Sequence, residues 1–480
     1  MYKKFVVCFV VAALGTLPLC GHVLGALVIG TDQTEDKSIE VRKLSLAPAA
    51  EPVPAMAYRL LPRLLNQKTG NAALLYYSAA ALCPDKEPED LYEKIGEWRD
   101  LPVDQLPRKE VEQALSSFSN SFHYIALAAQ RADCQWEMPL EDGYSLQLPH
   151  LSTFRRMIFA MQLRIRLKIA DGQTDQALEM LQQGLYMGRS IARGRTVIQD
   201  LVGTAIAALM FREVEGLIQM PDSPNLYWAL TALPNPMIDM YSSLEYEREV
   251  LFIEFPVLRN LENEVLTPEQ ASTVVSDFMK KMQTLGGGDD DVPFEGLLPI
   301  GWVMLHYSDA KQFLARKGFS QQRIEEMPAA QAVLIYQKQE YLEMLDNMYK
   351  WFVIPYDQAQ PHLDKSERLF DGHNRARGIK ANLFCTLLPA LSRIAFLQAR
   401  LDRHIALLRT IEAIRMFAAD HSGRLPGSLA EITSVPIPSD PVTGKDFLYD
   451  RIDARNARLE APVSPAESRK RPVYELAIKP

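Results

Sequence analysis

The stretch "LRIRLKIADGQTDQALEMLQQGLYMGRSIARGRTVIQD", residues 163–200, contains two short breaks between apolar, periodic segments. Gly172 marks the first break and Gly194 the second. The segments around the breaks predict helices because their apolar residues recur at three- and four-residue steps: 151–170, 174–192 and 196–218. Since a connection of two or three residues can do little but reverse the chain, we expect three antiparallel neighbours.

The first break is similar to the join between helices in tetratricopeptide-like arrays, with Gly172 at the turn and Ala177 five residues later. The sequence has no clean internal period, however, so a regular repeat is not predicted. We therefore expect an irregular helical solenoid or bundle.

Outside this stretch the pattern is mainly helical, with a change of character in the last sixty residues. Further helices are expected at 71–82, 111–131, 237–255, 328–349 and 382–420. Short β-like runs follow at 447–449 and 473–478. The predicted fold is thus mainly α, closed by a small C-terminal α+β cap.

Composition shifts divide the 480 residues into successive parts. Prolines and polar residues mark a linker before the helices, and a run of three glycines and three aspartates marks a flexible loop. The expected parts are a signal peptide or anchor at 1–30, a linker at 31–55, a helical domain at 56–285, the loop at 286–293, a continued helical domain at 294–403 and the cap at 404–480.

The N-terminus predicts export. Lys3 and Lys4 precede an apolar run at 5–19, and small residues at 23–26 offer a cleavage point, which is typical of a secretory signal. A second interpretation is an uncleaved anchor over 5–29, and a third is a lipoprotein signal at Cys20. In each case the body is expected in the periplasm or elsewhere outside the cytoplasm, touching the membrane only through an uncleaved N-terminal segment.

Charge and cysteine content narrow the partners. The 52 basic and 60 acidic residues give a net charge of −8 without a concentrated basic face, so nucleic acid is not expected as a partner.

An exported protein can hold a disulfide, for which Cys83 and Cys134 are the first pair to test. The alternative is that these two thiols and Cys385 are buried and free.

No metal or cofactor site is predicted. His362, His373 and His404 are widely spaced, and none belongs to a His-Glu-x-x-His pattern. The aspartates at 289–291 lack the alternating spacing of a calcium loop and favour a solvated segment instead.

Catalytic residues cannot be assigned from motifs. Glu245 and Glu249, four residues apart on one predicted helix, are weak candidates for an acid and base pair in glycoside chemistry. The ordinary interpretation is an exposed face with local ion pairs. The chain has no Gly-x-Ser-x-Gly, phosphate-loop, dinucleotide or Cys-x-x-Cys signature.

The sequence resembles other proteins in two respects. The order of a helix, "HSGRLPGSL" and "IPSDPVTGKDFLY" resembles the region after the long helix in major pseudopilins of type II secretion, matched at Gly423, Pro426, Leu429, Asp440, Pro441, Gly444 and Tyr449. The chain also resembles uncharacterised exported helical proteins of planctomycete-type bacteria, in this ending and in the blocks "NAALLYYSAAAL", "LRIRLKIADGQTDQALEMLQQGLYMGRSIA" and "SLEYERE". The second resemblance implies fold and location.

Three functions follow as expectations. The first is a non-catalytic, exported envelope scaffold that binds envelope proteins, because stacked helices offer large surfaces without a reactive centre. The second is a hydrolase that acts on envelope or carbohydrate material through acidic residues such as Glu245 and Glu249. The third, implied by the pseudopilin resemblance, is a secretion-system accessory protein.

Overall fold

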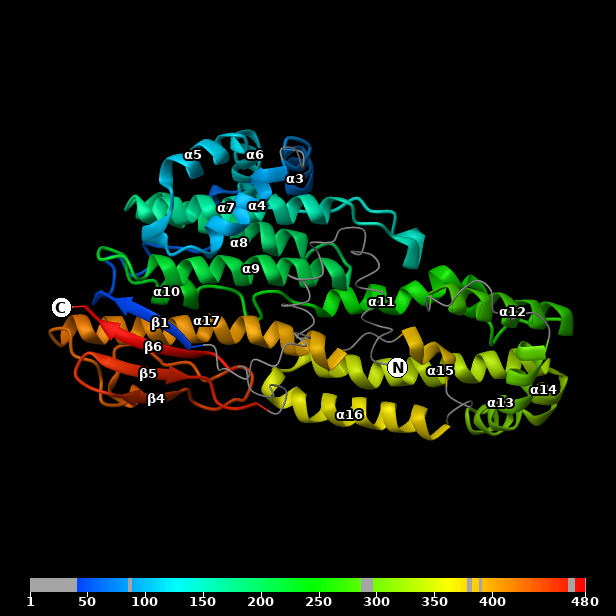
Figure 1. Cartoon of the computed structure of the whole chain (residues 1–480). Helices are drawn as coiled ribbons and strands as arrows, with labels where there is room; N and C mark the ends of the chain where they lie inside the picture. Colours follow the sequence, from blue (N-terminus) through cyan, green and yellow to red (C-terminus); the bar gives the residue numbers. More distant parts are fainter. Residues whose placement is uncertain are drawn as a thin grey trace. The chain divides into compact units, whose positions relative to one another are not determined.

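The computed structural model describes residues 41–84, 89–285, 297–377, 382–387, 391–464 and 471–479. These residues form two compact units. Unit 1 comprises Pro139–Gln147 and Leu244–Ile394, and unit 2 comprises the described parts of 33–138, Leu148–Ser243 and Ala395–Pro480. The mainly α fold with a small C-terminal sheet is confirmed (Figure 1). The predicted leader at 1–30 and loop at 286–293 lie outside the described residues.

Unit 2 contains most of the helices that the sequence predicts, together with both sheets. Its helices are α3 (Ala72–Ala81), α4 (Glu89–Asp100), α5 (Arg108–Ser116), α6 (Ser119–Ala129), α7 (His150–Ala170), α8 (Thr174–Ile191), α9 (Val197–Leu217), α10 (Tyr227–Thr231) and most of α17 (Leu391–Asp420). Its strands are β1 (Val41–Leu46), β2 (Lys68–Asn71), β3 (Arg131–Asp133), β4 (Leu448–Arg451), β5 (Asn456–Glu460) and β6 (Val473–Ile478).

Helices α7, α8 and α9 pack against one another as the expected neighbours, and we refer to them as the helical layer (Figure 1). Gly172 turns the chain between α7 and α8 with a φ of 69°, a conformation that favours glycine. Thr196 caps α9 by accepting a hydrogen bond from the Gln199 backbone N–H at 3.2 Å. The predicted boundaries at both breaks are therefore confirmed to within a residue or two.

Small residues let α8 and α9 approach closely. A Cβ atom on Gly203 would lie 2.4 Å from the Gly188 carbonyl oxygen and 2.9 Å from the Ala192 Cβ. No side chain larger than hydrogen fits there without moving a helix. This contact fixes the spacing of the layer.

The predicted helix at 111–131 is two helices, α5 and α6, because the chain breaks between Ser116 and Ser119. Phe118 lies at this break and is fully buried, so it fills the core where the two helices meet. The short parallel sheet of β2 and β3 packs beside α3, and it was not predicted.

The cap sheet has the strand order β1-β6-β5-β4. β4, β5 and β6 pair antiparallel, whereas β1 pairs parallel with β6, Val41 opposite Val473 and Leu46 opposite Ile478. β1 lies within the range that the sequence analysis assigned to a linker. Leu44 and Leu46 alternate with exposed residues and are buried, which stabilises residues 41–46 as a strand.

Helix α17 ends as the sequence predicts. Gly423 has a φ of 78° and donates its backbone N–H to the Ala418 carbonyl at 2.8 Å, which closes the helix. Gly444 has a φ of 69° and donates to the Asp440 carbonyl at 2.8 Å, which closes the predicted turn before β4. β6 has the predicted bounds, and β5 was missed.

Unit 1 is helical throughout the described residues. Its helices are the larger part of α11 (Tyr241–Glu254), then α12 (Pro268–Leu285), α13 (Leu297–Arg316), α14 (Gln321–Glu326), α15 (Ala329–Tyr349) and α16 (Tyr356–Arg377). Gly143 has a φ of 54°, and a Cβ there would lie 2.5 Å from Glu254 Oε1. In the described ranges, no helix is both long and apolar enough to cross a membrane.

Candidate functional site

From here on the cap means the part of α17 in unit 2, the sheet β1-β6-β5-β4 and the segments that connect them. The cap contains the largest buried charged side chains of unit 2. Arg403 and Arg415, both on α17, are fully buried, as are the carboxylates of Glu412 and Asp440. A buried charge is costly unless it is paired and hydrogen-bonded. The partners of these side chains therefore determine how the cap is assembled.

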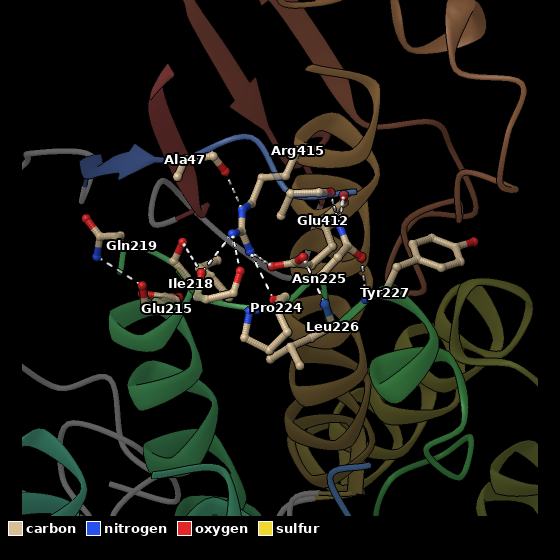
Figure 2. A network of polar contacts seen from close by, with 12 residues as sticks. Ala47, Glu215, Ile218, Gln219, Pro224, Asn225, Leu226, Tyr227, Glu412 and Arg415 are labelled. Atoms are coloured by element: carbon tan, nitrogen blue, oxygen red, sulfur yellow. Dashed lines mark hydrogen bonds and ion pairs between the residues drawn. The ribbon is translucent and has the colours of Figure 1, made fainter. Parts of the chain in front are cut away.

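Arg415 joins α17 to two segments that are distant in sequence (Figure 2). Its guanidinium lies 2.8 Å from Glu412 Oε1 and donates to the Ser223 carbonyl at 3.0 Å and to the Ala47 carbonyl at 2.9 Å. One side chain thus connects α17, the chain after β1 and the loop after α9. Burial raises the pKa of Glu412, although Arg415 opposes this.

Asn225 completes the same network (Figure 2). Its side-chain amide donates to the Glu412 carbonyl at 2.8 Å and to the Ala49 carbonyl at 3.1 Å. The backbone N–H of Leu226 donates to Glu412 Oε2 at 3.0 Å. The Arg415 guanidinium, the Glu412 carboxylate and the Asn225 amide all have hydrogen-bond partners. We therefore interpret the network as structural: it connects α17 to the chain after β1 and to the loop after α9.

Glu215, near the end of α9, is the second charged centre of the cap. Its Oε1 accepts from Arg42 at 2.7 Å, from Tyr474 Oη at 2.7 Å and lies 2.6 Å from His404 Nε2. These partners come from β1, β6 and α17. Burial alone would raise the pKa of Glu215, but His404, Arg42 and Tyr474 together lower it to about 2.

Arg403 fixes the turn that precedes β4. Its Nε and Nη2 donate to the two oxygens of Asp440 at 2.8 and 2.9 Å, a bidentate pair. Asp440 also accepts from the Val442 backbone N–H at 3.1 Å and from Thr443 Oγ1 at 2.7 Å. The Asp440-Pro441-Val442-Thr443-Gly444 turn is thereby held on α17, and it positions β4.

β4 ends the cap sheet with one edge unpaired by any described strand. Ile452 donates its backbone N–H to the Asn456 carbonyl at 2.9 Å, so positions 448, 450 and 452 direct their backbone groups toward β5. The alternation then points the N–H and C=O of Tyr449 and Arg451 toward the free edge. Leu448 and Ile452 beside them are 51% and 64% exposed.

Tyr449 and Arg451 are nonetheless held in place by their side chains. Tyr449 Oη donates to the Pro426 carbonyl at 3.0 Å, and Arg451 donates to the Leu425 carbonyl at 3.3 Å. The edge is therefore a preformed strand whose backbone groups point outward. Such an edge can pair with an extended segment of another chain.

Two other buried carboxyl groups have raised pKa values. Burial raises the pKa of Glu213, whose partners are Gln162 at 2.7 Å and Arg166 at 3.8 Å. Burial also raises the pKa of Asp402 to about 7, against a hydrogen bond from the Met237 backbone N–H. Both groups accept hydrogen bonds that tie α7 or the loop after α10 to a neighbour, so we interpret them as structural.

The structure places the catalytic candidates in unit 1, on α11. Glu245 is exposed, and Glu249 forms an ion pair with Arg259. Arg248, between them in sequence, pairs with Asp346 at 2.5 Å. This arrangement agrees with the ordinary interpretation of an exposed face with local ion pairs.

The three histidines have separate environments or fall outside the description. His404 contacts Glu215, and His362 stacks on Trp351 with ring centroids 4.0 Å apart. His373 lies in α16, and its side chain is outside the described set. Within the described part of the chain, no three His, Cys, Asp or Glu side chains are grouped to hold a metal ion.

Cys83, Cys134 and Cys385 are buried and form no disulfide in the described structure, so the alternative to a Cys83–Cys134 disulfide applies. Cys83 lies 3.7 Å from Tyr92 Oη, and Cys134 lies 3.7 Å from the Ser190 carbonyl. Burial raises the pKa of the Cys134 thiol to about 12, which disfavours the reactive thiolate.

A hollow of about 370 Å³ in unit 2 lies beside the turn between α7 and α8. Two of its carboxylates, Asp175 and Asp222, come from different segments. Its remaining lining residues are Tyr58, Gly172, Gln173, Thr174, Gln176 and Pro224. Among the described residues, no hydrogen bond joins the hydroxyls of Tyr58 and Thr174 to a carboxylate of this set, so it does not indicate a reaction class.

The chain matches no protein-family model, and no curated protein or solved structure is significantly similar to it. The function of the candidate site is therefore inferred from the geometry of this chain alone.

Sequence reasoning found part of this site. It predicted the Asp440 turn and a strand at 447–449, since proline and glycine mark turns. It missed Glu215, Arg42 and Tyr474, which are separated by up to 432 positions. In the sequence, Glu215 is recognisable only as a charged residue within an apolar helix. No spacing rule links such a residue to Arg42 or Tyr474.

Proposed function

We propose that this protein is a non-catalytic, exported protein of the cell envelope that binds partner proteins at the free edge of β4. The observation that carries the proposal is the preformed edge itself, with the backbone groups of Tyr449 and Arg451 directed outward. A partner strand would satisfy those groups by extending the sheet.

The side chains beside the edge support a protein partner. Leu448 and Ile452 lie two positions from Asp450 on one face of the strand, and both are more than half exposed. Side chains of an added strand would pack against them at alternate positions. Proteins usually protect an exposed edge with charges or a covering segment. The charged residues of β4 are Asp450 and Arg451, and Arg451 is held against the Leu425 carbonyl.

Export is supported by the N-terminal pattern: a positive start followed by the apolar run. Fractionation of cells that produce the full chain tests this part. Recovery in the cytoplasm alone would overturn the proposed location.

The binding proposal is tested by capture of partners from an envelope extract with the full chain and with a Leu448→Lys, Ile452→Lys double variant. Lysines on the edge should repel strand addition and abolish the capture of a specific partner. Val463→Lys is the matched control, because Val463 is 63% exposed in the same unit but outside β4. Equal recovery of the same partner with the double variant would contradict the proposal.

A secretion-system accessory role is a second candidate. It is supported by the order of α17, the Asp440 turn and the antiparallel strands, because the pseudopilin resemblance depends on that order. The test is whether the captured partner is a pilus-like component. The hydrolase alternative is left without a supporting observation, since Glu249 is paired with Arg259.

A further inference from the structure

A turn in unit 2 exposes two adjacent leucines to solvent. Residues 63–66 are all exposed, and Leu64 and Leu65 are 84% and 98% exposed. Single apolar residues are common on protein surfaces, whereas neighbouring exposed apolar residues form a patch that can mark a contact site. We refer to residues 63–68 as the leucine turn.

The leucine turn is held in position at both ends. Within it, the Asn66 N–H donates to the Arg63 carbonyl at 2.9 Å, and the Gln67 N–H donates to the Leu64 carbonyl at 3.1 Å. At its C-terminal end, the Lys68 N–H donates to the Gln130 carbonyl at 2.6 Å.

The segment just before the turn is also fixed. Leu60 is only 1% exposed, and Gln182 on α8 donates to the Leu61 carbonyl at 3.0 Å. The two leucines are therefore presented by anchored backbone, and their exposure is a property of the fold.

The charged residues of the leucine turn itself are both cations. Arg63 and Lys68 flank the leucines and are exposed, and Arg131 lies next to the turn, where it donates to the Thr69 carbonyl at 2.9 Å. Residues 52–84 contain no Asp or Glu, although the whole chain has 60 acidic residues in 480. Asp133, opposite Asn71 in the short sheet, is the acidic residue nearest in register.

An apolar pair between cations has the chemistry of a contact with an anionic bilayer. Leucines enter the boundary between headgroups and acyl chains, while Arg and Lys remain at the level of the phosphates. We propose that the leucine turn inserts Leu64 and Leu65 into the surface of a bilayer that contains anionic phospholipid. Arg63 and Lys68 then lie against lipid phosphates.

The size of the feature favours lipid over protein. Two leucine side chains offer at most a few hundred Å² of apolar surface, whereas a standard protein interface buries about 800 Å² on each partner. The neighbouring exposed residues Asn66 and Thr69 are polar and do not enlarge the apolar surface. Insertion into a fluid surface requires only the tip.

The N-terminal pattern agrees with this geometry, and this step rests on the proposed envelope location. If the apolar run at 5–29 stays in the membrane, the eleven residues from 30 to 40 reach at most about 40 Å to Val41. Unit 2 would then be tethered close to the bilayer. The lipid contact extends the proposed function, because it adds a membrane surface distinct from the protein-binding edge of β4.

The test uses the full chain carrying Leu65→Trp and vesicles of equal parts phosphatidylcholine and phosphatidylglycerol. We expect the added tryptophan fluorescence, taken as the difference from the parent chain, to shift to shorter wavelength and to be quenched by brominated lipid. Val265→Trp in unit 1 is the control, because Val265 is 91% exposed and has no reason to enter lipid. No quenching at position 65, or equal quenching at both positions, would overturn the proposal.

The partition of each variant between water and the vesicles measures how much the leucines and the cations contribute to membrane binding. The Leu64→Gln, Leu65→Gln double variant should weaken binding to the same vesicles by at least about tenfold, since each leucine loses its burial. The Arg63→Gln, Lys68→Gln variant should weaken binding and reduce its salt dependence. Unchanged binding by the leucine variant, or identical quenching in phosphatidylcholine alone, would contradict the proposal.

Two other results are informative. Crosslinking of the turn to an envelope protein, with no lipid quenching, would assign the leucines to a protein partner and reject the lipid contact. Recovery of the chain in the cytoplasm would overturn the proposed location while leaving the vesicle result intact, so the two failures are distinguishable.

Discussion

The helical layer α7–α9 and the cap of unit 2 are stabilised by different means. The layer depends on shape, as in the approach of Gly203 to the Gly188 carbonyl. The cap depends on charge, because Arg403, Arg415, Glu412 and Asp440 are buried together with their partners. A close contact of the first kind responds to a change in volume, whereas a buried charge responds to loss of its partner and to pH. The layer holds such a charge as well, at Glu213.

The largest effect should come from breaking the buried ion pair. Arg415→Met leaves Glu412 buried without its cation and should lower the stability of the cap by about 3–5 kcal/mol. Hydrogen exchange of the amides in β1 and β6 measures this locally, which avoids assuming two-state unfolding of the two units. Arg424→Met is the control, because Arg424 is exposed and its side chain makes no hydrogen bond or ion pair within the described residues.

The same pair gives a sharper test of charge against packing. Adding Glu412→Leu to Arg415→Met removes the unpaired carboxylate and should restore part of the lost protection, since a matched apolar pair can replace a buried ion pair. No recovery would show that the hydrogen bonds of Arg415 to Ser223 and Ala47 dominate.

The second effect is a dependence of stability on pH. The pKa of Glu215 is lowered from 4.5 to about 2, so its contribution of about 3 kcal/mol is present above pH 4.5 and is lost as the pH falls toward 2. Glu215→Gln should flatten the acid limb of unfolding curves measured between these pH values. An unchanged acid limb in the variant would exclude Glu215 as its cause.

Glu213, two residues away on α9, supplies the matched comparison. Its pKa is raised by burial, so its contribution is complete at low pH and is lost as the pH rises through the raised value. Glu213→Gln should therefore leave the acid limb steep and reduce the loss on the side of higher pH. Identical pH profiles for the two variants would contradict the assignment of opposite shifts.

A third, smaller effect tests the layer. Gly203→Ala should lower stability by about 1–3 kcal/mol, because its Cβ would clash with the Gly188 carbonyl. Gly216→Ala on the same helix should raise stability by up to about 1 kcal/mol, since its Cβ would lie 3.6 Å from Ile169 in ordinary contact. Urea unfolding measures the change in the free energy of unfolding for both variants. A change of the same sign in the two variants would contradict the prediction.

The smallest effect is expected at the predicted catalytic pair. Glu249→Ala removes a surface ion pair with Arg259 and should change stability by about 0–1 kcal/mol. The variant should also leave partner capture unchanged. A change in turnover of a defined carbohydrate polymer would favour the hydrolase alternative instead.

The layer could be predicted from sequence and most of the cap interior could not. Gly172, Thr196 and the apolar periodicity of 151–218 are local signals, so the helix bounds follow from them. Gly423 and Gly444 were likewise readable, because positive φ at a turn favours glycine.

β1 and its contacts depend on distant partners. Residues 41–46 resemble a polar linker in composition until β6 pairs with them, and Arg42 meets Glu215 and Tyr474 only in the folded cap. The candidate edge of β4 was predicted in position, but its outward backbone groups depend on the register with β5. Pairing information of this kind is not contained in local periodicity.

The pairing of β1 with β6 sets the order in which unit 2 can be completed. The strands lie near opposite ends of the chain, and Arg42 and Tyr474 are 432 positions apart. A chain that emerges from its N-terminus would leave β1 unpaired until residues 473–478 have appeared. The cap sheet would thus be completed late, after the helices between β1 and β6 have been synthesised.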